Sequence, residues 1–201
     1  GAGLMIALVQ SRPPFLGDIH EDEVGLQVAI VGSRRIKTVY QLAYRRAGDQ
    51  LAPAMLRASA EIGSSIHWPV DPRQTALTAS DDYIDRLSAL LALRNYRNAD
   101  IRDLPLYLDV PCGAYSRLGE MGADIRYLSQ RADELELDPH DIVCELPSHL
   151  AEFETLQAMA RMLRHYGATI ALAHTRPDDP LSMWIDRLRP DYVRLSGDWF
   201  N

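Results

Sequence analysis

The pattern of apolar and polar positions predicts alternating strands and helices in the second half of the chain. Three short apolar runs are typical of buried strands, and the segments between them repeat apolar residues at helical spacing. Gly167 stands where the first of these helices should end. Strands separated by single helices indicate parallel pairing, in a barrel or an open sheet. The predicted strands are Ile142–Leu146, Ala168–Ala173 and Tyr192–Leu195, and the helical faces are Leu150 to Leu163 and Trp184, Ile185 and Leu188.

The first half gives a less regular pattern. Ser80 is a suitable N-cap for an amphipathic helix, and two aspartates follow it in the first turn, where negative charge is favourable. Residues 1–20 are interpreted as an N-terminal segment or linker, and residues 21–201 as one domain. The predicted elements are a helix over Val24–Val31, a strand over Ile36–Tyr44, a loop over Ala58–Gln74, a helix over Ser80–Asn98, a strand over Leu106–Val110 and a helical face from Ile125 to Leu135.

Composition narrows the classes of function. The chain has 201 residues, 47% of them hydrophobic and 24% charged, as in an ordinary globular protein. Its net charge of −7 argues against sequence-independent binding to nucleic acid. No apolar run approaches the roughly 18 residues of a membrane span. Two cysteines, Cys112 and Cys144, form no disulfide framework. We therefore expect a cytoplasmic domain, either free or as the cytoplasmic part of a membrane-anchored protein, with Cys144 as a core residue.

Three motifs occur in order along the second half of the chain. They are CELPS (Cys144–Ser148), LRHYGATIALAHTRPDD (Leu163–Asp179) and LRPDYVRLSGDWF (Leu188–Phe200). Together they resemble the EAL domain family, the bacterial phosphodiesterases of cyclic diguanylate and their inactive relatives. The resemblance implies an α/β fold, a TIM-barrel-like EAL domain with parallel strands inside and helices outside. Such barrels need about 250 residues. Because the family's final segments have no counterpart here, we expect an incomplete barrel.

The resemblance also assigns roles to individual positions. The family hydrolyses its substrate with two metal ions held by carboxylates, and four of those acidic positions are replaced here. Alanine has no donor atom, and histidine does not reproduce an oxygen-rich magnesium site. Arg194 stands at a position where the family has a lysine. Because the pKa of arginine is so high, Arg194 cannot replace that lysine as an acid or base. The chain is therefore predicted not to be an enzyme, with no catalytic residue, metal or cofactor. The replaced positions are Pro53, Ser148, Ala173 and His174.

Some matching positions keep groups that bind ligands. A carboxylate within an apolar strand needs a partner, so Glu145 is either a residual ligand contact or half of an ion pair inside the barrel. Asp109 replaces a family asparagine, and it either binds a cation or forms a paired carboxylate near Glu145, with Arg194 as its partner. Gln41 and Arg57 match positions that touch the nucleotide. The predicted ligand-binding residues are Gln41, Arg57, Asp109, Glu145 and Arg194.

Three functions compete. The first is a degenerate EAL domain that acts as an adaptor through protein–protein contacts, in the motility, pilus or biofilm settings that the resemblance implies. The second is a metal-independent receptor of cyclic diguanylate. The third is a phosphodiesterase or another barrel hydrolase, with His174, Glu145 and Asp109 as an acid/base set. The sequence leaves open whether the chain forms a homodimer. It also leaves open whether Trp184, Trp199 and Phe200 are contact aromatics or core residues.

Overall fold

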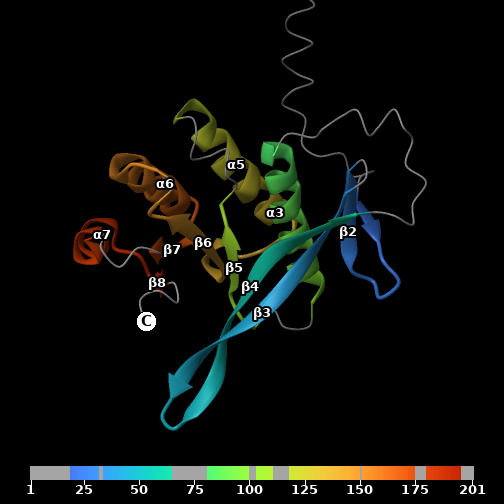
Figure 1. Cartoon of the computed structure of the whole chain (residues 1–201), viewed down its shortest axis with the longest axis horizontal. Coiled ribbons are helices and arrows are strands. Elements are labelled where there is room, and N and C mark those ends of the chain that lie inside the picture. Colours follow the sequence, from blue (N-terminus) through green and yellow to red (C-terminus); the bar gives the residue numbers. More distant parts are fainter. Residues whose placement is uncertain are drawn as a thin grey trace, which may run out of the picture.

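The computed structural model describes residues 19–31, 34–64, 81–99, 103–110, 118–149, 151–174 and 180–195. They form a mixed α/β fold in which one eight-stranded sheet follows the chain order (Figure 1). The strands are β1 (Ile19–Glu21), β2 (Gln27–Val31), β3 (Arg34–Ala47), β4 (Gln50–Ser64), β5 (Leu106–Asp109), β6 (Ile142–Pro147), β7 (Thr169–His174) and β8 (Tyr192–Leu195). The helices are α3 (Asp81–Asn98), α5 (Leu118–Glu134), α6 (Phe153–His165) and α7 (Leu181–Leu188), with a 3₁₀ turn η2 (Pro139–Asp141) before β6.

The sheet has an antiparallel half and a parallel half. Strands β1 to β4 form an antiparallel meander, whereas β4 to β8 pair in parallel. The long ribbon of β3 and β4 belongs to both halves, and one end of it extends well past the other strands (Figure 1). Between the described strands, no pairing joins β8 back to β1, so the described sheet is open rather than a closed barrel.

Two predictions in the first half are wrong. Val24–Val31 is a turn followed by β2, not a helix, and residues 58–64 of the predicted loop continue β4. In the turn, the Asp22 carboxylate accepts bonds from the Val24 and Leu26 amides, and Gly25 has a φ of +82°. Both strands exist because β3 lies between them and pairs with each, which is a non-local cause. The rest of the predicted loop, residues 65–74, lies outside the described residues.

The predicted elements of the second half are confirmed within a few residues. Helix α6 ends at His165, and Gly167 follows with a φ of +90°, the left-handed conformation that glycine adopts most readily. The Gly167 amide donates to the Arg164 carbonyl, which closes the helix end. The predicted boundary after residue 20 falls within β1, and residues 1–18 lie outside the described part of the chain.

The helices cover one face of the parallel strands and make the main core. Alternate strand residues such as Leu106, Leu146 and Leu172 point into it, where they meet Met159 and Leu163 of α6. Cys144 is buried in this layer as predicted, and burial raises the pKa of its thiol to about 12. Trp184 is buried too, against Phe153, so its predicted alternative use as an exposed contact residue is wrong. Trp199 and Phe200 lie outside the described residues.

Helix α3 holds the antiparallel half in place. The buried Asn95 side chain accepts a hydrogen bond from the Gln27 amide at 2.8 Å and donates one to the Gln27 carbonyl at 2.9 Å. It therefore satisfies both backbone groups of one residue of β2. The Tyr40 hydroxyl donates to the Ala92 carbonyl and ties β3 to the same helix. Among the described helices, none has the length and apolar character needed to cross a membrane.

Candidate functional site

Polar side chains gather on the face of the sheet that the helices do not cover. Arg57 of β4 lies opposite Tyr107 of β5, and Asp109 lies opposite Glu145 of β6. Arg194 of β8 lies opposite Ala173 of β7. Since side chains alternate between the two faces with a period of two, these residues share the inner face, away from the helix-facing leucines.

Glu145 and Arg194 form a two-point ion pair. The Arg194 Nη2 lies 2.7 Å from Glu145 Oε1, and its Nε lies 2.8 Å from Oε2. The Tyr107 hydroxyl donates a further hydrogen bond to Oε2. The Glu145 side chain is only 6% exposed, and that of Arg194 is 36% exposed. Three donors thus hold one buried carboxylate, in the planar fork geometry that arginine favours.

The charges of this cluster follow from those contacts. Burial alone would raise the pKa of Glu145, but the hydrogen bonds from Arg194 and Tyr107 hold it below its usual value. The bond to Glu145 raises the pKa of Arg194, and burial, with the charge of Glu145, raises the pKa of Tyr107. Near neutral pH the cluster therefore contains an ionised Glu145, a cationic Arg194 and a neutral Tyr107.

The pKa of Asp109 shifts in the opposite direction to that of Glu145. Burial of the carboxyl and the negative charge of Glu145 raise the pKa of Asp109, while Arg57 and Arg194 act against that rise. Asp109 and Glu145 are neighbours in the sheet register, so the two carboxyls compete for the same cations. The printed hydrogen bonds of Arg194 go to Glu145, with Asp109 beside it in the register, so whether Asp109 binds a cation or is a paired carboxylate stays a prediction.

The predicted ligand-binding residues all lie on this inner face. Gln41 of β3 is directly opposite Arg57, and its side chain is exposed to solvent. Arg57 is half-buried between Gln41 and Tyr107 in the sheet register. Whether Gln41, Arg57 and their neighbours bind a ligand stays a prediction. Tyr107 was missed, although its place two residues before Asp109 already put it on the same face.

The proposed acid/base set does not assemble. Ala173 lies on the inner face, so its successor His174 points to the opposite face of β7, away from Glu145 and Asp109. His174 is fully buried there, and its Nδ1 lies 3.0 Å from the hydroxyl of the buried Ser148. The prediction that His174 would act together with Glu145 and Asp109 is wrong, because the strand alternation separates them.

Pro53, at the position of the family's signature glutamate, lies at an irregularity in the pairing of β3 and β4. The register of β3 and β4 shifts between Ala43 and Tyr44, and the exposed Pro53 pairs with Tyr44 beyond that shift. A β-bulge of this kind turns the following side chains to the other face. Pro53 therefore has no carboxylate, and the register shift turns its position away from the face on which Glu145 lies.

The residues present do not fit a two-metal centre. Within the described segments, no group of three or more histidine, cysteine or carboxylate side chains is placed to hold a metal ion. Asp109 and Glu145 are the only acidic pair on the described inner face, and both Glu145 oxygens already accept hydrogen bonds from Arg194. A metal ion at this place would first have to displace the guanidinium.

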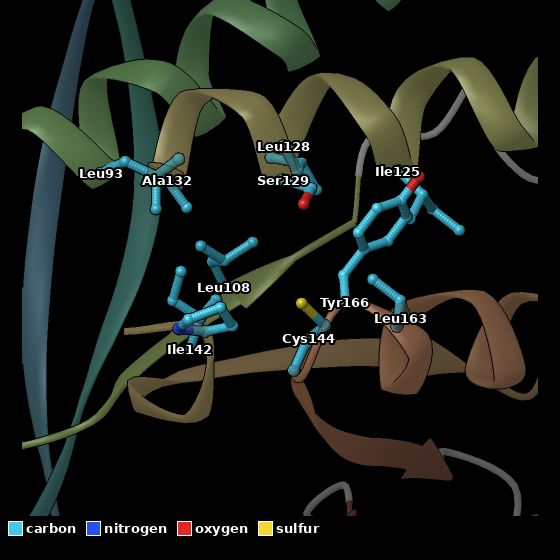
Figure 2. A pocket seen from close by; sticks show the side chains of 12 residues that line it. Leu93, Leu108, Ile125, Leu128, Ser129, Ala132, Ile142, Cys144, Leu163 and Tyr166 are labelled. Carbon is cyan, nitrogen blue, oxygen red and sulfur yellow. The ribbon is translucent and has the colours of Figure 1, made fainter. Parts of the chain in front are cut away.

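The helix-facing side of the sheet contains a different hollow. An apolar cavity of about 40 Å³ lies between α5, α6 and strands β5 and β6 (Figure 2). Cys144, Leu108 and Ile142 form its floor, and Leu163 and Tyr166 come from the α6 side. Since its walls offer almost no polar atoms, this hollow is a packing gap rather than a recognition site for a polar ligand.

Comparison with solved structures places this fold among EAL domains. The FimX EAL domain from Pseudomonas aeruginosa bound to c-di-GMP is 12% identical, with a TM-score of 0.61, and the match covers 81% of this chain and 66% of that chain. The PaMucR phosphodiesterase in its c-di-GMP complex is 14% identical, with a TM-score of 0.60 and coverage of 83% and 71%. Klebsiella pneumoniae BlrP1 is 16% identical, with a TM-score of 0.60 and coverage of 81% and 40%.

These matches show the fold and not the activity, because the identities are low. The chain spans 66% of the FimX EAL domain and 40% of the BlrP1 chain. No protein-family profile and no curated protein sequence matches it. An EAL-like mixed α/β fold is therefore established by the shape of the chain, and the predicted α/β fold class is confirmed. A complete TIM barrel is not observed among the described strands.

Proposed function

We propose that this chain is a non-catalytic regulatory domain in cyclic diguanylate-related signalling, which acts by binding a protein partner. The observation that carries the proposal is the two-point bond between Arg194 and Glu145. Metal-assisted hydrolysis needs carboxylates that are available to a cation. Here the Glu145 carboxylate is present, but the Arg194 guanidinium binds both of its oxygens.

On the described part of the inner face, Ala173 and His174 do not supply metal ligands beside Glu145. Ala173 has no donor atom on that face, and His174 points to the other side. Asp109 is the neighbour of Glu145 in the sheet register, and the Arg194 guanidinium already occupies both Glu145 oxygens beside it. These features support binding rather than hydrolysis.

A protein-binding role is supported by the exposed ribbon. Leu42 and Tyr44 of β3 are 43% and 55% exposed, and Leu51 of β4 is 72% exposed. Contiguous exposed apolar patches mark interaction sites, and tyrosine is enriched among the residues that carry binding energy at interfaces. Leu42, Tyr44 and Leu51 lie at the end of the ribbon that extends past the rest of the sheet (Figure 1).

A second candidate is a metal-independent receptor of cyclic diguanylate. It is supported by Gln41 and Arg57, which lie opposite each other on the inner face, since an arginine can bind a phosphate through two hydrogen bonds. The solved structures of FimX and PaMucR are described as bound to, or in complex with, c-di-GMP. A hydrolase is the third candidate, and it lacks a corresponding set of groups on the inner face.

One calorimetric titration separates these functions. Cyclic diguanylate is titrated into the purified chain with magnesium and with a chelator, and the mixture is then analysed for hydrolysis product. We expect neither binding heat nor product. Saturable binding in the chelator that is lost in Arg57→Ala, but kept in the exposed control Arg45→Ala, would establish the receptor instead. Magnesium-dependent product would refute a non-catalytic domain.

A further inference from the structure

Strand β3 has a long edge that no other described strand covers. Strand β2 pairs with β3 only from Arg34 to Lys37, whereas β4 lies along the other side of β3 as far as Ala47. The residues from Gln41 to Ala47 are exposed, except for the half-buried Ala43. At about 3.4 Å per residue they form an edge of about 20 Å, at the end of the ribbon that extends past the sheet (Figure 1). An uncovered edge presents backbone N–H and C=O groups that can pair with another chain.

The other edge of the ribbon is less suitable for such pairing. Ala43 of β3 pairs with Met55 of β4, and the next residue of β3 pairs with Pro53. Ala54 is therefore an extra residue on β4, and a bulge of this kind interrupts the regular ladder. Proline in addition has no N–H to donate. Since β3 has neither a bulge nor a proline over its uncovered part, its edge is the regular template of the two.

The two faces of this edge differ in polarity. Because side chains alternate along a strand, Leu42 and Tyr44 share one face of β3, and Gln41 and Arg45 share the other. Leu42 and Tyr44 are 43% and 55% exposed, and Gln41 and Arg45 are exposed as well. A strand added along this edge would therefore lie beside apolar side chains on one face and beside a polar, cationic group on the other.

The ribbon is basic although the chain is acidic. Residues 34–64, which form β3, β4 and their turn, contain six arginine or lysine residues and two acidic residues, so their net charge is +4, against −7 for the whole chain. Lys37 Nζ lies 3.5 Å from Glu61 Oε1, and Arg46 Nη2 lies 4.0 Å from Asp49 Oδ1. Among the described residues, Arg45 forms no ion pair. The ribbon therefore attracts acidic segments and repels a second ribbon.

We propose that an extended acidic segment of the partner protein adds to the sheet as a strand along Gln41–Ala47 of β3, with its apolar side chains beside Leu42 and Tyr44 and its carboxylates beside Arg45. The inference rests on the proposed protein-binding role and specifies the mode of binding and the chemistry of the partner. In strand addition, backbone hydrogen bonds give affinity and alternate side chains give specificity. A lipid surface fits less well, since the ribbon ends in a turn that contains the charged Asp49.

The probe for this edge is a peptide of about seven residues that alternates glutamate and valine, titrated into the whole chain and followed by NMR. We expect saturable binding and slower hydrogen exchange of amides between Gln41 and Ala47. Two further peptides are N-methylated, one at the valines and one at the glutamates. Only one of these sets of N–H groups faces β3, so one of the two should bind about tenfold more weakly than the other.

A peptide that alternates lysine and valine controls for charge, and we expect it not to bind. The inference is overturned if the glutamate peptide does not bind, if the lysine peptide binds equally well, or if both N-methylated peptides bind like the parent. Unchanged hydrogen exchange from Gln41 to Ala47 in the saturated complex would also overturn it, because docking through side chains alone leaves the edge amides open to water.

Substitutions test the position of the site. Arg45→Glu should weaken the glutamate peptide about fivefold, whereas Arg161→Glu, at an exposed arginine of α6, should leave its affinity unchanged. Leu42→Ala combined with Tyr44→Ala should weaken it as well, through loss of the apolar face. If these variants keep their circular dichroism spectrum and bind the peptide normally, the site is refuted. Hydrolysis of cyclic diguanylate would refute the proposed function while leaving the peptide result standing, so the two failures can be told apart.

Discussion

Removing the Arg194 side chain is the most direct test of the inner-face cluster. Arg194→Ala would remove from Glu145, whose side chain is 6% exposed, the two guanidinium hydrogen bonds and the cation that balances its charge. Loss of one partner from a fully buried ion pair costs about 3–5 kcal/mol. Because the Arg194 side chain is itself 36% exposed, water enters the space that it leaves, and we expect a loss of about 2–3 kcal/mol in the free energy of unfolding.

Urea unfolding, followed by circular dichroism, measures this loss. A chain of this size changes its melting temperature by about 2–4 °C per kcal/mol, so the melting temperature should fall by about 4–12 °C. The double variant Arg194→Ala with Glu145→Gln removes the stranded charge and should recover about 1–2 kcal/mol of the loss. A loss below about 1 kcal/mol would match an ordinary surface pair and refute the reasoning. So would a double variant no more stable than Arg194→Ala alone.

The same pair predicts how stability depends on pH. The pKa of Glu145 is held below its usual value, so its ionised form stabilises the fold above the pKa of the unfolded chain. That contribution is lost as the pH falls through the lower pKa of the folded chain. In Arg194→Ala the hydrogen bonds from Arg194 no longer lower the pKa of Glu145. Protonation of Glu145 then removes the cost of burying its negative charge. The difference in unfolding free energy between the two proteins should therefore shrink below about pH 4.

Three further substitutions test other parts of the structure by urea unfolding. Tyr107→Phe removes one donor to a buried carboxylate and should cost about 1–2 kcal/mol, and no measurable loss would mean that the hydroxyl bond is dispensable. Asn95→Ala leaves the amide and carbonyl of Gln27 without their partner and should cost about 2–3 kcal/mol, and an unchanged midpoint would contradict that role. Gly167→Ala places a methyl group 3.2 Å from a proline side chain at a φ of +90°, so it should cost more than Gly48→Ala, which has open space at a φ of +64°. Equal costs would refute the packing argument.

Periodicity was sufficient for the parallel half of the fold. The runs around Ile142 and Ile170 are short, apolar and followed by helical repeats, and a strand buried on both faces has this appearance. Their helices carry enough apolar residues on one face to be recognised without knowing the partner. Local pattern and final structure agree there because each element buries its own apolar residues against the same core.

The antiparallel half required information that a single segment does not contain. Val24–Val31 is a short run that fits a helix or a strand equally well, and its pairing with β3 decides the outcome. Residues 58–64 are rich in alanine, serine and glycine, which have low strand propensity, yet β3 imposes an extended conformation on them. In both places a distant strand overrides the local preference.

The site was predictable as a set of residues but not as a set of bonds. Glu145 in an apolar strand implied a buried partner, but the sequence suggested Arg194 only as a partner of Asp109. The sequence did not reveal that Tyr107 would be the third donor, because its hydroxyl becomes relevant only once the strand register is known. Nor did it reveal that Ala173 and His174, adjacent in the chain, would serve opposite faces of β7.

For the non-catalytic domain that we propose, the cluster offers a way to neutralise Glu145 without a metal ion. A buried carboxylate must be neutralised by something, and a metal ion and a guanidinium are alternative means of doing so. A lysine would offer one point charge, whereas Arg194 offers two parallel hydrogen bonds that match the carboxylate. With Tyr107 as the third donor, Glu145 is satisfied within the chain itself. The described inner face therefore has a defined charge arrangement among its own side chains, and Gln41 of the same face is exposed.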